Sequence, residues 1–286
     1  MKAMILAAGL GTRLHPLTDT RPKALVEVAG RTLLEITLTR LSSFGVRDVI
    51  INVHHFPDMI LDYLQAHDNF GLHIEISREE QLLDTGGGLK KASWFFLQDP
   101  AHADDPFILH NVDVISTIDL RRMLNYHKEK QALATLAVQH RESSRQLLFD
   151  ADLRLCGRRA SPDQPPELAR SNPTRSMQDG AASQPAETNQ DCHSERSEES
   201  AFSESHAGRS QPPQALAFSG IHIISPRLLH LMEEQGAFSI IDTYLHLSAR
   251  GEKILAFPAD DAYWRDLGKP ADLAQAAVDL KKKVWF

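Results

Sequence analysis

The first 139 residues alternate between short apolar runs and segments with helical periodicity, and this alternation limits the fold more than any other feature. Apolar, β-branched runs at 2–7, 48–53, 72–77, 107–111 and 134–139 are typical of buried strands. Between them, apolar residues recur every three or four positions over 34–44, 58–66, 86–96 and 118–130, which indicates helices. Because parallel strands need long crossover connections, we expect an α/β fold with a Rossmann-like, mostly parallel sheet flanked by helices.

A polar segment interrupts this pattern between residues 157 and 213. It has almost no apolar periodicity, and it includes a charged run that begins at Cys192 and ends at Ser200. Such a composition buries too little apolar surface to offset the entropy of ordering, so we expect a disordered, low-complexity insertion. Ordered patterns return with a strand at 215–224 that is interrupted at Ser219–Gly220, followed by helices, a strand at 253–257 and a helix at 270–283. We therefore expect two parts of one domain, 1–156 and 214–286, on either side of an insertion at 157–213.

A glycine-rich loop with cations follows the first expected strand. In the stretch 6–25, LAAGLGTRLHPLTDTRPKAL, Gly9 and Gly11 precede Arg13 and Lys23. Small residues let backbone N–H groups approach a phosphate, and the cations neutralise its charge, which favours a nucleoside triphosphate site. A dinucleotide fingerprint is excluded because Leu14 stands where it needs a third glycine, and Lys23 lacks the context of a Walker A loop.

The same loop carries a family resemblance. G-x-G-T-R-L-x-P-L-T-x-x-x-P-K-x-L resembles the signature of the sugar-1-phosphate nucleotidyltransferases, also called sugar-nucleotide pyrophosphorylases. The resemblance continues at 84–88 (DTGGG), 111–113 (NVD), 218–220 (FSG) and 264–268 (WRDLG), and covers most of the chain outside the insertion. It is nearest to N-acetylmuramate-1-phosphate uridylyltransferases and mannose-1-phosphate guanylyltransferase-like proteins. It implies a fold of the nucleotide-diphospho-sugar transferase type.

The resemblance implies a nucleotide site built by two loops. Arg13 is our candidate for holding triphosphate oxygens, because a guanidinium binds two oxygens and stays charged. Lys23 matches the family lysine near the α-phosphate and the incoming sugar phosphate, so Arg13 and Lys23 are the expected catalytic cations. The expected nucleotide-binding residues are Ala8, Gly9, Gly11, Thr12, Arg13, Thr85 and Gly86.

The resemblance also implies a metal site and a sugar site. Asp113 follows the fourth expected strand, and Asp266 matches the second metal aspartate of the family, so both are expected to bind Mg²⁺. Asn111 and Gly220 match sugar-contact positions. Many relatives have a glutamate–lysine pair between the fifth strand and the serine–glycine strand, and this chain has no evident counterpart.

The expected reaction joins a nucleoside triphosphate to a sugar 1-phosphate, forming a nucleoside-diphosphate sugar and pyrophosphate. UTP with N-acetylmuramate 1-phosphate, a cell-wall sugar, is the preferred pair. GTP with mannose or heptose 1-phosphate, or a non-catalytic sugar-nucleotide sensor, are the alternatives. The formal charge of −7 argues against a nucleic-acid partner. Two cysteines without metal spacing, no apolar run long enough for a membrane span and no signal peptide favour a cytoplasmic protein without a membrane partner. The sequence specifies no oligomeric state.

Overall fold

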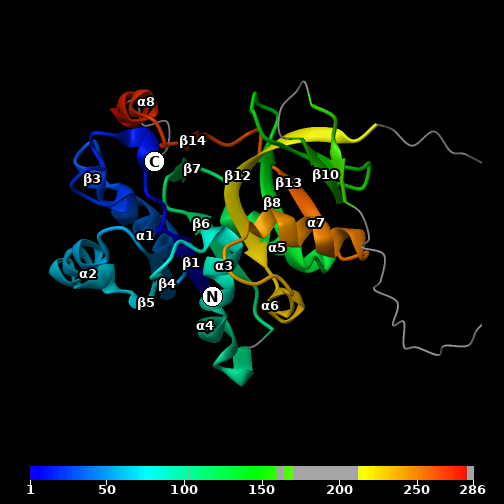
Figure 1. Cartoon of the computed structure of the whole chain (residues 1–286), viewed down its shortest axis with the longest axis horizontal. Coiled ribbons are helices and arrows are strands. Elements are labelled where there is room, and N and C mark those ends of the chain that lie inside the picture. The colour runs from blue at the N-terminus through cyan, green and yellow to red at the C-terminus, as the bar shows by residue number, and fades with distance from the viewer. Residues whose placement is uncertain (103, 160–163, 170–211, 282–286) are drawn as a thin grey trace, which may run out of the picture.

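A ten-stranded mixed sheet forms the centre of the molecule (Figure 1). The structure is a computed structural model, and it describes residues 1–102, 104–159, 164–169 and 212–281. The central strands are β1 (Lys2–Leu6), β4 (Asp48–Val53), β5 (His73–Arg78), β6 (Phe107–Asn111), β8 (Ala134–Gln139), β12 (Gln214–Ile224) and β13 (Ile254–Pro258). The parallel order is β6-β1-β4-β5, while β12 lies antiparallel between β6 and β8, and β13 pairs in parallel with β8. Six of these seven strands therefore run in one direction, with β12 opposed.

These strands confirm the apolar runs seen in the sequence. The expected interruption in β12 is also present, because its pairing with β8 shifts register between Phe218 and His222. Gly220 lies within this bulge and has a φ of 73°, a conformation that favours glycine. The bulge lies at the edge of the sheet where the parallel strands end.

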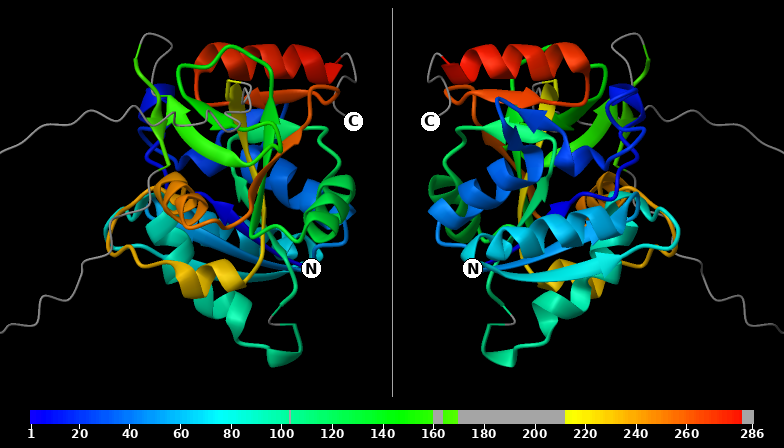
Figure 2. Two further views of the ribbon diagram at one scale, coloured as in Figure 1. Left: turned by 90° about the vertical axis from the view of Figure 1, so that its right-hand side faces the viewer. Right: turned by 90° about the vertical axis from the view of Figure 1, so that its left-hand side faces the viewer.

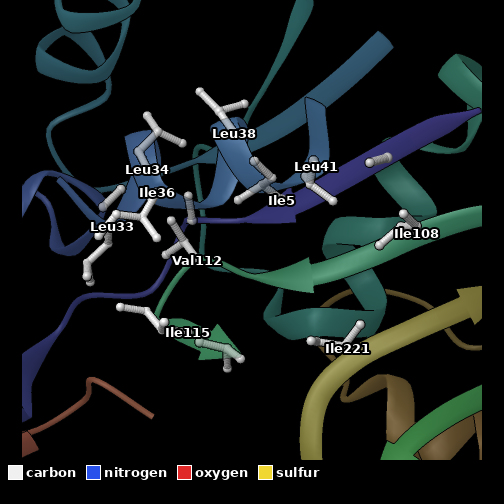
Figure 3. Packing of buried hydrophobic residues seen from close by; sticks show 14 of the residues in the cluster. Ile5, Leu33, Leu34, Ile36, Leu38, Leu41, Ile108, Val112, Ile115 and Ile221 are labelled. Atoms are coloured by element: carbon white, nitrogen blue, oxygen red, sulfur yellow. The ribbon is translucent and has the colours of Figure 1, made fainter. Parts of the chain in front are cut away.

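Helices cover both faces of the sheet (Figures 1 and 2). They are α1 (Leu33–Ser43), α2 (Pro57–Ala66), α3 (Asp84–Lys91), α4 (Ser93–Leu97), α5 (Leu120–Lys130), α6 (Arg227–Leu231), α7 (Ile240–Ala249) and α8 (Pro270–Lys281). Successive strand residues point to opposite faces, so Ala3 and Ile5 belong to the core cluster that contains buried residues of α1, α2, α5 and α8, whereas Met4 belongs to the cluster with those of α3, α4, α6 and α7. Figure 3 shows Leu38 and Leu41 of α1 next to Ile5, with Ile108 and Ile221 on the neighbouring strands β6 and β12.

Local signals explain where α1 begins and ends. The Thr32 side chain accepts a hydrogen bond from the Glu35 N–H, which caps the first turn. The helix ends before Phe44, and Gly45 follows with a φ of 87°. The expected end near 44–45 is confirmed.

The described parts of 157–213 contain strands, so the expected insertion begins too early. β9 (Gln146–Phe149), β10 (Leu155–Arg159) and the short β11 (Glu167–Leu168) extend the sheet beyond β12. Arg158 lies within the expected insertion, but its guanidinium binds Glu167 and Asp242. Strand pairing and ion pairs stabilise this polar edge despite its weak apolar pattern. The remainder of the expected insertion, 160–163 and 170–211, lies outside the described residues.

Two small sheets and four 3₁₀ turns complete the described structure. β2 (Glu27–Val28) pairs with β3 (Arg31–Thr32), and β7 (Val114–Ser116) pairs with β14 (Trp264–Asp266). Helix α8 lies against β14 and β2 at one end of the molecule (Figure 2). The 3₁₀ turns are η1 (Thr12–Leu14), η2 (Lys23–Leu25), η3 (Asp68–Gly71) and η4 (Pro100–His102). Within the described ranges, every helix is too short or too polar to cross a bilayer.

Candidate active site

The ends of the parallel strands form a cavity at one edge of the sheet. Leu6, the last residue of β1, is in register with Asn52 on one side and Asn111 on the other. The loops after β1 and β6 therefore leave the sheet side by side, and a cavity of about 410 Å³ lies between them. Strand ends, both loops, the segment that opens α3 and one residue of the segment before α7 line it: Leu6, Ala7, Ala8, Gly9, Lys23, Asn52, Leu82, Asp84, Thr85, Asn111, Val112, Asp113 and Ala237. Ligands of open α/β sheets bind at this edge, at the carboxyl ends of the strands.

The loop after β1 folds back on itself, which brings Lys23 to the cavity. Gly11 has a φ of 69°, and a Cβ on it would lie 2.9 Å from Thr18 Cγ2 and 3.2 Å from Lys23 Cβ. Thr18 is fully buried, and its hydroxyl donates to the Gly11 carbonyl over 2.9 Å. Thr12 and Arg13 follow in the 3₁₀ turn η1 with exposed side chains. Gly11 therefore permits a tight loop in which Lys23 faces the strand ends.

Two aspartates from distant parts of the chain meet beside this loop. The pairing of β14 with β7 sets Asp266 against Val114, and the Leu267 N–H donates to the Asp113 carbonyl over 2.8 Å. Lys23 Nζ binds Asp113 Oδ2 in an ion pair. Burial raises the pKa of Asp266, and the charge of Asp113 raises it further, while Lys23 and Arg13 lower it. The two carboxylates are thus close enough to repel each other.

Gly268 allows Arg13 to approach the carboxylate of Asp266. A Cβ on Gly268 would lie 2.5 Å from Arg13 Nη2 and 2.7 Å from Asp266 Oδ1. The Gly268 N–H also donates to Asp266 Oδ1 over 2.6 Å. The structure therefore brings together the two expected catalytic cations and the two expected metal ligands. Carboxylate oxygens are the ligands that Mg²⁺ prefers, and a cation between Asp113 and Asp266 would relieve their repulsion. No group of three or more His, Cys, Asp or Glu side chains arranged for a metal exists among the residues described.

The two expected sugar-contact residues also lie together. A Cβ on Gly220 would lie 2.9 Å from both Asn111 Nδ2 and Val114 Cγ2. Asn111 lines the cavity, so the bulge of β12 forms one wall behind it. A side chain at position 220 would displace Asn111.

The second glycine loop contributes to the cavity and to packing. Thr85 lines the cavity, and its hydroxyl accepts from the Ile240 N–H over 3.0 Å. The Gly86 N–H donates to the Phe238 carbonyl over 2.9 Å, and a Cβ on Gly86 would lie 2.4 Å from the Phe238 ring. Gly87 is similarly close, because its Cβ would lie 2.3 Å from the Gly236 carbonyl oxygen. These glycines let α3 pack against the segment before α7, and the N–H of Gly86 is already used there.

Asn52 and Glu79 connect the two loops, and the sequence analysis missed them. Asn52 Oδ1 accepts from the Ala7 N–H over 2.8 Å, and its Nδ2 donates to Glu79 Oε1 over 2.7 Å. Glu79 Oε2 in turn accepts from the Leu83 N–H over 2.9 Å. Both side chains are buried, and a Cβ on Gly88 would lie within 2.8 Å of each. The sequence signal that could have indicated this bridge is Asn52, a polar residue near the end of an otherwise apolar strand.

Comparisons with known proteins agree with this architecture. The family model described as "Nucleotidyl transferase" matches residues 2–147, about half of the chain. The N-acetylmuramate alpha-1-phosphate uridylyltransferase of Caulobacter vibrioides is 47% identical over 116 residues, which cover 40% of this chain and 46% of that protein. The mannose-1-phosphate guanyltransferase of Gibberella zeae is 37% identical over 139 residues, covering 48% of this chain and 37% of that protein. The matched stretch therefore spans less than half of either relative.

A solved structure resembles nearly the whole chain. The UDP-glucose pyrophosphorylase from Acinetobacter baumanii aligns with a TM-score of 0.70 and 16% identity, over 99% of this chain and 93% of that one. This likeness confirms the expected fold of the nucleotide-diphospho-sugar transferase type. With the family model covering half of the sequence, the chain belongs to the nucleotidyl transferase family.

Proposed function

We propose that the protein transfers a nucleotidyl group from a nucleoside triphosphate to a sugar 1-phosphate, and releases pyrophosphate. A phosphate oxygen of the sugar substrate attacks the α-phosphorus, and the bond from that phosphorus to the pyrophosphate oxygen breaks. The attacking oxygen is an anion near neutral pH, so the reaction needs alignment and charge stabilisation more than a general base. The observation that carries the proposal is the convergence of Arg13, Lys23, Asp113 and Asp266 at one strand edge.

The cations of the loop suit two different phosphates. Lys23 lines the cavity beside Asp113, and its compact ammonium can bridge the α-phosphate and the sugar phosphate. Arg13 lies beside Asp266 and Gly268, and its planar guanidinium suits the oxygens of the β- and γ-phosphates. Ala8, Gly9 and Thr85 line the cavity, and their backbone groups are our candidates for reading the base.

Asp113 and Asp266 would hold a Mg²⁺ ion, which supplies positive charge to the phosphate oxygens when bound. The repulsion between the two carboxylates supports this assignment, because a cation between them relieves it. In the structure, Lys23 Nζ neutralises Asp113 instead. Each aspartate thus has an opposite charge nearby, with Arg13 close to Asp266.

The preferred substrates are UTP and N-acetylmuramate 1-phosphate, as the Caulobacter vibrioides relative is named for that sugar phosphate and for uridylyl transfer. The alternative is GTP with mannose or heptose 1-phosphate, which the Gibberella zeae relative supports for mannose. Asn111 and Gly220 are the candidate sugar contacts, because Asn111 lines the cavity and Gly220 lies directly beside it.

The test is a pyrophosphate-release assay of the full chain with Mg²⁺, across the four common nucleoside triphosphates and a panel of sugar 1-phosphates. We expect turnover only when a nucleotide and a sugar 1-phosphate are both present, and fastest with UTP and N-acetylmuramate 1-phosphate. Faster turnover with GTP and mannose 1-phosphate would select the alternative pair. Binding of a sugar nucleotide without turnover for any pair would contradict the proposed activity and favour a sensor.

A further inference from the structure

Arg141 is a cation at the active-site edge that the proposed reaction does not use. It lies two residues beyond the end of β8, at the edge of the sheet where the parallel strands end. Its guanidinium carbon lies 3.6 Å from the centre of the Trp264 ring, so the two groups stack. Trp264 opens strand β14, which ends at Asp266. The stack therefore belongs to the strand that carries one of the proposed metal ligands.

Hydrogen bonds fix this guanidinium next to the bulge of β12. Arg141 Nη2 donates to the Phe218 carbonyl over 2.7 Å, and Trp264 Nε1 donates to the Ser219 carbonyl over 2.8 Å. The next residue is Gly220, which touches Asn111 at the cavity wall. Arg141 and Trp264 thus hold the bulge that forms the proposed sugar end of the site.

Arg141 has a donor that nothing in the described chain satisfies. Its Nε is buried and has no hydrogen-bond partner within the residues that the structure describes. A buried donor of a charged group is expensive to leave without an acceptor, and such groups are normally paired. This unpaired donor lies beside the bulge of β12, outside the residues that line the cavity, and among the residues described Arg40 and Arg159 have an unpaired Nε of the same kind.

The charge of Arg141 is less well compensated than the charges of Arg158 and Arg265, although the more deeply buried Arg40 also forms no ion pair in the described ranges. Arg158 binds Glu167 and Asp242, and Arg265 binds Asp272 and Asp279. Arg141 forms no ion pair with any residue in the described ranges. Burial lowers its pKa, and the charge of Asp266 opposes that shift. Since Asp266 also faces Arg13 and the proposed metal, Arg141 has no carboxylate of its own.

We propose that Arg141 binds an anionic group of the sugar substrate, either its 1-phosphate or a carboxylate carried on the sugar. This inference rests on the proposed function and makes Arg141 a specificity-determining residue at the sugar end. A guanidinium held flat against an indole presents its remaining N–H groups in one plane, which suits the paired oxygens of a phosphate or a carboxylate. It lies in the part of the chain where the sequence offers no glutamate–lysine pair.

The test compares the full-length wild type with Arg141→Gln and Arg141→Lys, and uses Arg145→Gln as the matched control. Arg145 belongs to the same loop, and its side chain is exposed. The KM of each variant is measured for the nucleotide, for N-acetylmuramate 1-phosphate and for N-acetylglucosamine 1-phosphate, with thermal unfolding measured in parallel. We expect Arg141→Gln to raise the KM for the sugar phosphate by about 10- to 100-fold while the nucleotide KM stays within twofold. Arg145→Gln should change neither.

The pattern across the two sugars identifies the anion. A higher KM for both sugar phosphates assigns Arg141 to the 1-phosphate. A higher KM for N-acetylmuramate 1-phosphate alone assigns it to the carboxylate. Unchanged KM for both sugars, or a rise confined to the nucleotide, overturns the inference. Arg141→Lys keeps a positive charge but loses the planar guanidinium. If Arg141→Gln unfolds, the KM values of Arg141→Lys for the two sugar phosphates are compared with those of the wild type instead. Absence of wild-type turnover would refute the proposed function itself, whereas normal wild-type turnover with unaffected variants refutes only the role of Arg141.

Discussion

Lowering the pH from 8 to 5 should destabilise the fold through the buried His127, and replacing that residue should remove this part of the loss. His127 lies in α5 and is 2% exposed, and its Nδ1 lies 2.9 Å from the hydroxyl of Thr135. Burial, with a smaller contribution from the charge of Lys128, lowers its pKa from 6.5 to about 4. The folded protein therefore keeps His127 neutral at a pH where the unfolded chain protonates it.

The direction and the size of this loss of stability follow from proton linkage. Between pH 6.5 and about 4, the unfolded chain binds more protons at this site than the folded protein does, so stability falls as the pH falls. The contribution of the neutral His127 side chain to the free energy of unfolding is fully present above pH 6.5 and decreases by about 1.4 kcal/mol for each pH unit below it. From pH 8 to pH 5, the expected loss from His127 is about 2 kcal/mol.

The assay is urea unfolding at half-unit steps between pH 5 and pH 8, for the wild type, His127→Gln and the control His73→Gln. The side chain of His73 is 61% exposed, so this control removes a surface histidine instead of a buried one. His127→Gln should be less stable than the wild type at pH 8, but should lose about 2 kcal/mol less on moving to pH 5. Equal slopes for His127→Gln and the wild type would refute the argument that burial keeps this side chain neutral.

Three further changes test the loops around the cavity. Lys23→Ala should lower kcat/KM for pyrophosphate release by at least about 100-fold, because it removes the ammonium beside Asp113; steady-state kinetics would show it. Gly87→Ala should destabilise the protein by about 1–3 kcal/mol, as its Cβ would lie 2.3 Å from the Gly236 carbonyl oxygen, and a melting temperature equal to that of the wild type would contradict this. Asn52→Ala should lower the free energy of unfolding by about 1–3 kcal/mol and raise the KM for the nucleotide, because it leaves the Ala7 N–H without its side-chain acceptor. Urea unfolding measures the first effect and steady-state kinetics the second.

Apolar periodicity was sufficient for the elements that build the sheet and its helices. Strands such as 48–53 are buried on both faces, and helices such as α1 carry a capping threonine and a terminal glycine, so local sequence and tertiary packing agree. The short strands that were not predicted include β7, β10, β11 and β14, together with β2, β3 and β9. Each has two to five residues; β7 and β14 pair across the chain, whereas β10 and β11 pair with neighbouring segments but have too few apolar residues to form a recognisable pattern.

The candidate site also divides into residues whose positions followed from the sequence pattern and residues whose positions did not. Adjacent parallel strands predicted that the loop after β1 would lie beside Asp113, since both follow strand ends at one edge. The approach of Asp266 to Asp113 depends on the pairing of β14 with β7, so only a family resemblance indicated it. The bridge between Asn52 and Glu79 depends on the adjacency of two strands together with two side-chain orientations, which the sequence does not encode locally.

The most direct test of the central claim is the rate of pyrophosphate release by Asp266→Asn, measured at saturating substrates and Mg²⁺. Asp261→Asn is the control, because that aspartate is exposed and pairs with Arg122 at the surface. If Asp266 helps hold the metal at the reacting phosphates, the rate should fall by at least about 100-fold while the melting temperature does not fall. Asp261→Asn should then retain the wild-type rate. A folded Asp266→Asn protein with a rate within twofold of the wild type would contradict the account.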